Sequence, residues 1–236
     1  MLVITIVIVL AITTLFGLYR KYKIDTFNIV ERDGGKYVLQ TVTLVNDFPN
    51  KEVMEKINSL LWRKLIGSYY DLGINDEDPQ KCDGDSDIKN VEISGSWLSF
   101  RQHDFFFCET AAHPSHGSTD YNIDLNSGSI VDLKIEIEKN VKDARQFREI
   151  IISKFIDSIP EMHDYFNDWF DMDMEYILNN YYPSYLIRAN KLIIKLEGFC
   201  YAASYYEQFE INLTFKELCQ YFKDSVDPIL SGFCQK

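Results

Sequence analysis

The chain opens with one long apolar stretch. Residues 2–19 carry no charged side chain, and as a helix they would span roughly 27 Å, enough for the hydrocarbon core of a bilayer. A cleaved signal peptide usually has a basic start and a small-residue cleavage site, and this segment has neither. We therefore predict an uncleaved transmembrane anchor at residues 1–19.

Beyond this stretch, the pattern alternates between the two-residue period of strands and the longer period of helices. Residues 20–36 are polar and predict a basic juxtamembrane segment and linker. Residues 71–90 are acidic and rich in turn formers, so we expect a loop there. Runs rich in β-branched and aromatic residues predict strands at 37–45, 91–102, 104–110, 121–125, 130–137, 185–188, 191–196 and 207–212.

Helices are predicted where apolar residues recur at helical spacing. This spacing holds over 53–65 and 141–155, and residues 161–182 predict a helix of mixed acids and aromatics. Thr214 and Glu217 form a capping box that opens a last helix.

The order of these elements predicts an α+β fold: a mainly antiparallel sheet with helices packed on one face, plus the N-terminal transmembrane helix. We expect a single α+β domain over residues 37–236, without internal repeats.

The negative net charge of the chain argues for some classes of binding partner and against others. The net charge is −12, and such a field repels phosphate backbones, so we expect no nucleic-acid binding. It would attract cationic partners and speed their encounter, although the same charge also serves plain solubility.

Cysteine usage bears on covalent structure and on cofactors. The five cysteines lack a Cys-x-x-Cys pair, which argues against a cysteine-based zinc site. One or two disulfides are compatible with an oxidising compartment, and Cys219 is expected to pack as a small hydrophobe on a helix. We predict no cofactor.

Two clusters contain metal-ligand residue types. Glu109, His113, His116 and Asp120 lie close together, but Pro114 breaks any helix that would align them, so we interpret the cluster as a polar loop. The run from 83 to 87 begins like a calcium loop but lacks the required glycine and glutamate further along, so we interpret it as a solvated acidic loop. We therefore predict no metal site.

A third cluster mixes acids with aromatics and supplies the candidate ligand-binding residues: Asp164, Tyr165, Asp168, Trp169 and Phe170. An amphipathic helix with its acids in water explains them most simply. They would also suit a contact surface for a cationic protein. If the protein were a glycan-acting enzyme, its catalytic carboxylates would be among Asp164, Asp168 and Glu175.

Short motifs in the middle of the chain resemble a known family. They are Leu98-Ser99-Phe100, Ala111-Ala112-His113-Pro114 and Tyr121-Asn122-Ile123-Asp124-Leu125, followed by Gly128 and Leu133. Together they resemble an envelope domain of unknown function found at the C-terminus of RsiV-like anti-sigma factors, which sense lysozyme outside the cell, and in PdaC-like peptidoglycan deacetylases. The resemblance covers most of residues 36–225, and Ala111 replaces the glycine usual in the family.

The resemblance implies that the domain faces the cell exterior or periplasm. Arg20, Lys21 and Lys23 follow the predicted anchor, however, and the positive-inside rule would keep that side cytoplasmic. We recognise neither a sigma-binding segment nor a deacetylase domain in the sequence, so we expect neither of those roles. In the family, His113 would be a structural turn residue rather than a metal ligand.

The leading hypothesis is a membrane-anchored, extracytoplasmic binding module, not an enzyme, for a protein or cell-wall ligand. A cationic, lysozyme-like partner fits the acidic field best. The alternatives are an immunity or inhibitor protein against a toxin, a glycan-acting enzyme, and a structural envelope protein.

Overall fold

The computed structural model describes residues 21–30, 36–46, 48–71, 82–108, 114–157, 182–189, 191–197, 210–225 and 228–234. Their contacts divide the chain into two compact units. Unit 1 draws on Met1–Lys89, Gln102–Thr119 and Leu125–Ser129, and unit 2 on Asn90–Arg101, Asp120–Asp124 and Ile130–Lys236. The two units are described separately below.

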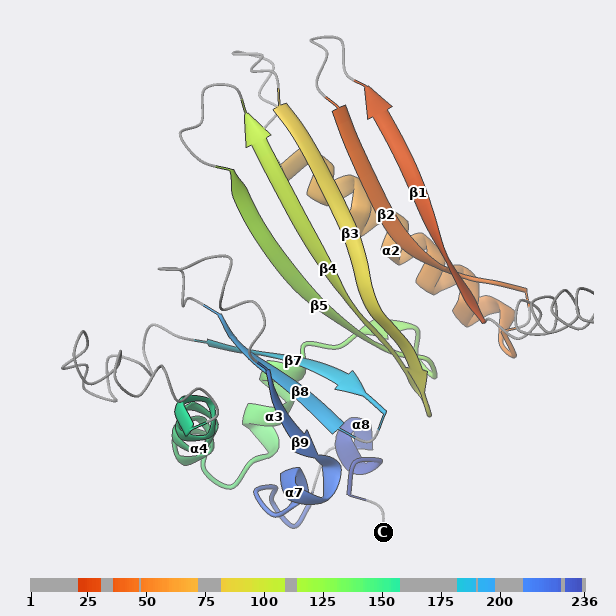
Figure 1. The fold of residues 1–236 in the computed structure, drawn as a ribbon. Coiled ribbons are helices and arrows are strands. Elements are labelled where there is room, and N and C mark those ends of the chain that lie inside the picture. Colours follow the sequence, from red (N-terminus) through yellow and green to blue (C-terminus); the bar gives the residue numbers. More distant parts are fainter. Residues whose placement is uncertain are drawn as a thin grey trace, which may run out of the picture. The chain divides into compact units, whose positions relative to one another are not determined.

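The larger sheet has the strand order β1-β2-β3-β4-β5-β6, and unit 1 contains β1, β2 and only parts of the other four strands. The strands are β1 (Tyr22–Val30), β2 (Lys36–Leu44), β3 (Cys82–Ser94), β4 (Trp97–Cys108), β5 (Ser115–Asp124) and β6 (Ser129–Ile130). β1 pairs antiparallel with β2, whereas β2 pairs parallel with β3, and Figure 1 shows β3, β4 and β5 running in alternating directions. A parallel pair needs a crossover, and the helix α2 (Lys51–Asp71) lies between its two strands in the chain.

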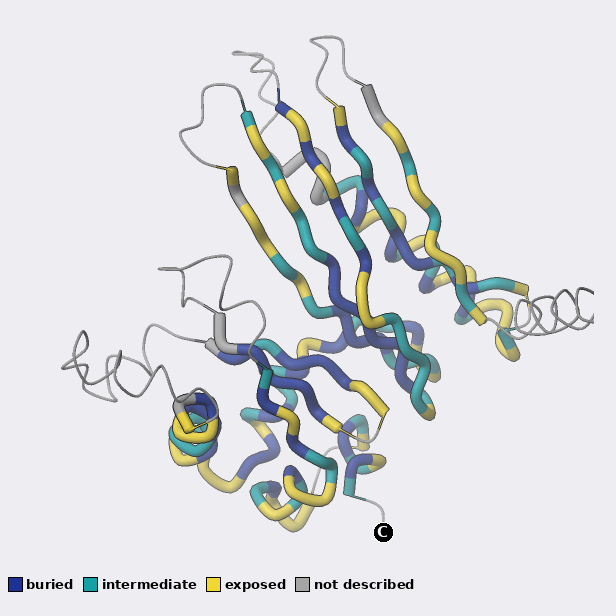
Figure 2. Tube along the Cα trace, viewed as in Figure 1, coloured by how far each residue is buried: buried dark blue, intermediate teal, exposed yellow. Residues whose placement is uncertain are grey.

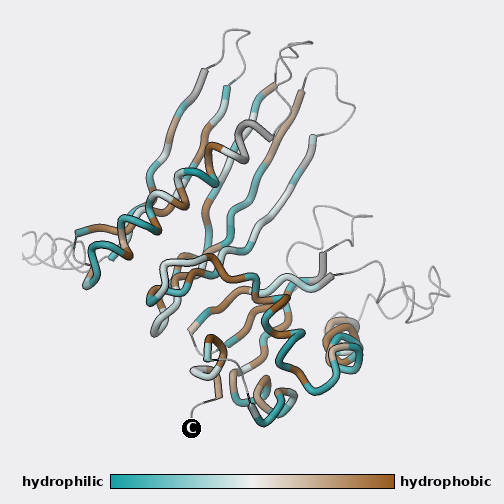
Figure 3. Tube along the Cα trace, turned by 180° about the vertical axis from the view of Figure 1, so that it is seen from behind, coloured by the Kyte–Doolittle hydropathy of each residue, from teal (hydrophilic) through white to brown (hydrophobic). Residues whose placement is uncertain are grey.

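Helix α2 lies along one face of this sheet, as the view from behind shows (Figure 3). Its N-cap is Asn50, whose side chain accepts a hydrogen bond from the Val53 N–H at 3.2 Å. Its buried residues are Met54, Ile57, Leu61 and Leu65. The apolar spacing predicted for 53–65 is therefore confirmed.

Strand β1 replaces the linker predicted for residues 20–36. It pairs with β2 along its whole length, from Tyr22 opposite Leu44 to Val30 opposite Lys36. The side chain of Asp25 helps to hold this edge, because its carboxylate accepts a hydrogen bond from the Thr43 hydroxyl at 2.7 Å. The prediction failed because an edge strand can expose most of its side chains and so lacks an apolar run.

Unit 2 contains a three-stranded antiparallel sheet of β7 (Tyr182–Arg188), β8 (Lys191–Glu197) and β9 (Ile211–Thr214). Its helices are α3 (Leu133–Asn140), α4 (Ala144–Asp157), α7 (Phe215–Cys219) and α8 (Pro228–Ser231). Side chains of α4, including Phe147, Ile151 and Phe155, join the buried core as the helical spacing predicted. The capping box of Thr214 and Glu217 is also confirmed.

The strand predicted at 130–137 is wrong. β6 ends at Ile130, and α3 begins at Leu133 with Asp132 as its N-cap. The Asp132 carboxylate accepts a hydrogen bond from the Ile135 N–H at 3.1 Å. The alternating apolar residues also place Leu133 and Ile137 one helical turn apart, and both are buried.

The fold is a mixed α+β structure rich in antiparallel sheet, which agrees with the coarser part of the predicted class. Across the described ranges, no helix is both long and apolar enough to cross a membrane. The predicted anchor at 1–19 and residues 161–181 of the predicted helix lie outside the described residues, and Tyr182 begins β7 instead. The anchor at 1–19 and the single domain over 37–236 stay predictions.

Two disulfides link cysteines within the units. Cys82 pairs with Cys108 in unit 1, and Cys219 pairs with Cys234 in unit 2. Cys219 packs against the core as expected, but as half of a disulfide rather than as a free thiol.

Candidate functional site: an acidic and aromatic sheet face

The exposed side chains of β3 and β4 define the candidate site. Leu65 of α2 packs in one cluster with Cys82 of β3 and with Phe106 and Cys108 of β4, so these residues face the helix. Because side chains alternate along a strand, their neighbours point to the opposite face of the sheet. That face carries Asp83, Asp85 and Asp87 from β3, Phe105 and Phe107 from β4, and His116 from β5; we call it the acidic-aromatic face.

Burial along β3 follows this alternation (Figure 2). Cys82, Ser86 and Ile88 are buried, whereas Asp83 and Asp85 are exposed. The predicted acidic loop at 71–90 is therefore wrong from Cys82 onward. Aspartate is rare in strands, but here every second position is an acid facing outward, and the buried positions between them form the inner face.

We infer that a β-bulge in β3 brings the acids and the aromatics to the same face. The turn at Gly95 pairs Ser94 with Trp97, whereas the disulfide places Cys82 beside Cys108 with 4.0 Å between their Cα atoms. From Cys82 to Ser94 the chain advances 12 positions, whereas from Trp97 to Cys108 it advances 11. β3 therefore contains one extra residue between these two pairs. Asn90 has a φ of 57° and marks the bulge. With the extra residue, Asp83 and Asp85 lie opposite Phe107 and Phe105.

The two phenylalanines leave much of their surface in solvent. Phe105 and Phe107 are each 38% exposed. The ring of His116 packs edge-on against Phe105, with 5.0 Å between the ring centroids. The face therefore presents aromatic surface directly beside carboxylates.

The charge of the face is only partly compensated. Asp83 accepts a hydrogen bond from the backbone N–H of Lys36 at 2.9 Å, which leaves its charge in place. Asp87 lies 3.2 Å from the Lys89 ammonium, in an exposed pair of small energetic value. Asp87 is thus paired with the ammonium group of Lys89. Such a surface suits a cation, which can contact a ring face and a carboxylate together.

The sequence-predicted site residues are mostly elsewhere. Asp164, Tyr165, Asp168, Trp169 and Phe170 lie outside the described residues, and so do Glu109 and His113 of the metal cluster. His116 belongs to the acidic-aromatic face. Among the described residues, no group of three or more metal-ligand side chains is arranged to hold an ion.

Asp120 belongs to a buried ionic cluster in unit 2. Its two carboxylate oxygens accept hydrogen bonds from Nε and Nη2 of Arg101 at 2.6 and 2.9 Å, and Arg101 also bonds to Glu210. The side chains of Arg101 and Asp120 are only 3% and 5% exposed. Burial opposes the charge of Arg101, but the hydrogen bonds and charges of Asp120 and Glu210 raise its pKa above the ordinary value. Asp120 is therefore a structural partner of Arg101.

Asn122, from the motif that carries the family resemblance, has a structural role in unit 2. It is 2% exposed, and its side-chain nitrogen donates to the Tyr185 carbonyl at 2.6 Å. Its side-chain oxygen accepts from the Ile187 N–H at 2.9 Å and from the Ser99 hydroxyl at 3.1 Å. One side chain thus links β4, β5 and β7, so this part of the motif specifies the fold rather than a ligand.

Gly128 of the same motif has a conformational role in unit 1. Its φ is 66°, and a Cβ there would lie 3.2 Å from the Lys56 side chain. The Lys56 ammonium also donates to the Ser127 carbonyl at 2.6 Å, which holds the turn against α2.

No protein-family model matches the chain, and no curated protein matches it. Several solved structures are similar in fold, among them the following two. A DUF3298 family protein from Pseudomonas aeruginosa PAO1 gives a TM-score of 0.52 at 10% identity, over 87% of this chain and 96% of that chain. A member of the same family from Bacteroides fragilis NCTC 9343 gives a TM-score of 0.51 at 10% identity, over 91% and 98%.

At this identity, the similarity concerns the fold alone. It supports the predicted resemblance to a domain of unknown function. The RsiV and PdaC context of that resemblance stays a prediction.

Proposed function

We propose that this protein is a membrane-anchored, extracytoplasmic binding module whose acidic-aromatic face captures a cationic protein. The observation that carries the proposal is the exposure of Phe105 and Phe107 beside the aspartates of β3. An arginine or lysine of a partner would find an aromatic surface and a carboxylate within reach of one side chain. Each cation–π contact at an exposed site contributes about 0.5–1 kcal/mol, so several contacts would have to act together.

The acidity of the whole chain supports a cationic partner. A net charge of −12 would steer a positively charged protein toward the molecule before any contact forms. A lysozyme-like wall hydrolase has the required charge, and the family resemblance led to the same partner class.

The two disulfides support the extracytoplasmic location. Disulfides form and persist in oxidising compartments and are rare in the reducing cytosol. The predicted anchor at 2–19 would hold the binding module at the membrane, while Arg20, Lys21 and Lys23 argue for the opposite orientation.

The binding proposal is tested with the full chain in nanodiscs and hen egg-white lysozyme as the cationic probe. We expect the triple variant Asp83→Asn, Asp85→Asn and Asp87→Asn to weaken binding at least about tenfold. The matched control neutralises three acids elsewhere, through Glu52→Gln, Glu55→Gln and Asp224→Asn, and should change the affinity less than about threefold. Lysozyme with acetylated lysines should bind poorly to the unchanged protein.

The outcomes distinguish binding at the acidic-aromatic face from attraction by the net charge of the whole protein. Equal losses in the two triple variants would show that net charge alone attracts the probe, and the acidic-aromatic face would be abandoned as the site. A Phe105→Ala and Phe107→Ala variant that bound lysozyme like the unchanged protein would remove the aromatic contribution.

The location is tested separately by protease digestion of cells. Cleavage of the domain when only the outer barrier is permeabilised would support the extracytoplasmic orientation. Protection until the inner membrane is opened would refute it, and partners would then have to be cytoplasmic.

A further inference from the structure

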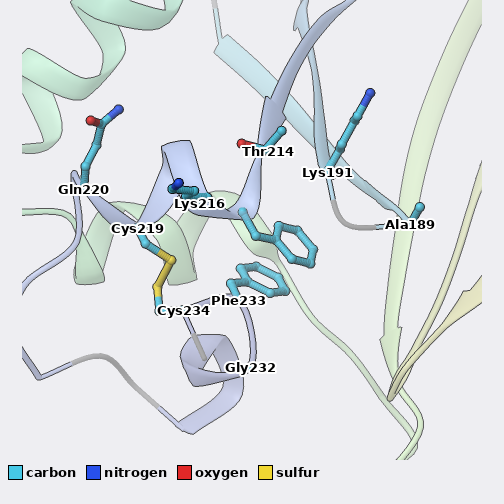
Figure 4. A pocket seen from close by; sticks show the side chains of 10 residues that line it. Ala189, Lys191, Thr214, Lys216, Cys219, Gln220, Gly232, Phe233 and Cys234 are labelled. Atoms are coloured by element: carbon cyan, nitrogen blue, oxygen red, sulfur yellow. A yellow bond between two sulfur atoms is a disulfide. The ribbon is translucent and has the colours of Figure 1, made fainter. Parts of the chain in front are cut away.

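A pocket of about 1070 Å³ lies within unit 2. Its walls come from the start of β8, the end of β9, helix α7 and the segment after α8, and Figure 4 shows the Cys219–Cys234 disulfide beside it. The volume lies just above the range of about 300–1,000 Å³ found for small-molecule sites. We call it the C-terminal pocket.

The floor of the C-terminal pocket is aromatic. The rings of Phe215 and Phe233 stack with 4.2 Å between their centroids and 17° between their planes. Phe233 is 4% exposed and is further supported by Trp97 at 5.9 Å, whereas Phe215 is only partly buried. The disulfide fixes the position of Phe233, because its neighbour Cys234 is bonded to α7. The pocket therefore offers a rigid apolar surface to an apolar body.

The rim of the pocket is cationic. Lys191 and Lys216 line it, both are exposed, and neither forms an ion pair with another residue in the described part of the chain. Glu217 follows Lys216 in the chain, and its carboxylate accepts hydrogen bonds from the hydroxyl and backbone N–H of Thr214 at 2.6 and 2.8 Å. These hydrogen bonds lower the pKa of Glu217, with smaller contributions from Lys154 and Lys191.

An aromatic floor and a cationic rim together favour a negatively charged ligand, whereas the acidic-aromatic face favours a positively charged partner. An exposed ammonium next to apolar walls favours an anion that carries its own apolar surface. We propose that the C-terminal pocket binds a small organic anion, with an aromatic or apolar body against Phe215 and Phe233 and a carboxylate or similar group at Lys191 and Lys216. The site is independent of the proposed protein-binding function.

The test uses 2-naphthoate as the probe and isothermal titration calorimetry on the full chain in phosphatidylcholine nanodiscs, with empty nanodiscs as the blank. We expect 2-naphthoate to bind and the uncharged 2-naphthamide to bind at least about fivefold more weakly. A Lys191→Gln and Lys216→Gln variant should lose the preference for the anion. Lys51→Gln and Lys64→Gln on α2 remove the same charge outside the pocket and should leave binding unchanged.

A second variant tests the location without changing charge. A Cβ at Gly232 would meet no atom within 4 Å, so Gly232→Leu fills space in the pocket without a backbone clash. We expect this variant to keep its thermal unfolding midpoint and to bind 2-naphthoate at least about fivefold more weakly. Equal binding by Gly232→Leu, or equal affinity for the acid and the amide, would overturn the proposal.

A third arm separates a free anion from an anionic lipid. Phosphatidylglycerol in the nanodiscs should not compete with 2-naphthoate. Competition that disappears in the Lys191→Gln and Lys216→Gln variant would assign the pocket to lipid headgroups and overturn the assignment to a free organic anion.

Discussion

At the scale of single residues, the side chains of asparagines link backbone segments. Asn58 of α2 bonds to both backbone groups of Leu44, accepting from its N–H at 2.8 Å and donating to its carbonyl at 3.0 Å. Asn122 of β5 bonds to backbone groups of two residues of β7, the Tyr185 carbonyl and the Ile187 N–H. Such side chains satisfy backbone groups that would otherwise be buried without partners.

Asn122→Ala should therefore destabilise the protein strongly. It leaves the Tyr185 carbonyl and the Ile187 N–H without their present partner, and each unsatisfied buried group costs about 1–3 kcal/mol. We expect a loss of about 2–4 kcal/mol in the free energy of unfolding, measured by urea denaturation. Asn28→Ala on the exposed side of β1 is the control, and comparable losses in both variants would contradict the assigned role.

The lowered pKa of Asp25, in the edge strand β1, predicts that the stability of the fold depends on pH. Hydrogen bonds from Lys23 and then from Thr43 lower its pKa below the ordinary 3.8. A carboxyl whose folded pKa is lowered stabilises the fold above its unfolded pKa, and this contribution is lost as the pH falls through the folded value. An NMR titration should place the Asp25 pKa below 3.8, and Thr43→Val should move it upward. A value at or above 3.8 in the unchanged protein would refute the interaction.

At the scale of elements, one bulge decides which face of the sheet β3 presents. Because strand side chains have a period of two, a shift of one residue exchanges the inner and outer faces. Without the extra residue at Asn90, the aspartates of β3 would lie opposite Phe106 and Cys108 rather than opposite the exposed phenylalanines. The acidic-aromatic face therefore depends on a local backbone feature.

The backbone at Asn90 gives a direct test. Its φ of 57° is in the left-handed region, which glycine adopts easily and β-branched residues do not. We expect Asn90→Gly to be close to neutral and Asn90→Val to cost about 1–2 kcal/mol of stability. Thermal denaturation of both variants checks this, and a valine variant as stable as the glycine variant would argue against the bulge.

At the scale of the whole molecule, the net charge of −12 would speed the encounter with the cationic protein proposed as partner. Long-range attraction acts before contact and is screened by salt, whereas short-range contacts at the face are screened less. The proposed function therefore predicts different salt responses for the two rate constants.

Raising the ionic strength from about 20 mM to about 500 mM should slow the association of lysozyme at least about tenfold and change its dissociation much less. Stopped-flow fluorescence resolves the two rates. An association rate that does not respond to salt would exclude electrostatic steering by this protein.

The helices and strands that are specified by residues close together in the chain followed from the sequence alone. The apolar spacing of α2 and α4, the runs of β7 and β8, and the Thr214–Glu217 capping box each depend on residues within a few positions of one another. The α+β class followed from their order. The acidic alternation of 83–87 was also visible as a period of two, but its composition favoured a loop.

The tertiary structure decided what depends on distant partners. Edge strand β1 is stabilised by β2, and the pairing of the cysteines and the bonds of Asn122 join residues far apart in the chain. The acidic-aromatic face and the C-terminal pocket arise in the same way, since strand register and helix packing bring their residues together. The sequence shows which side chains are present. Which of them come into contact depends on pairing between distant segments, and these contacts form only when the chain folds.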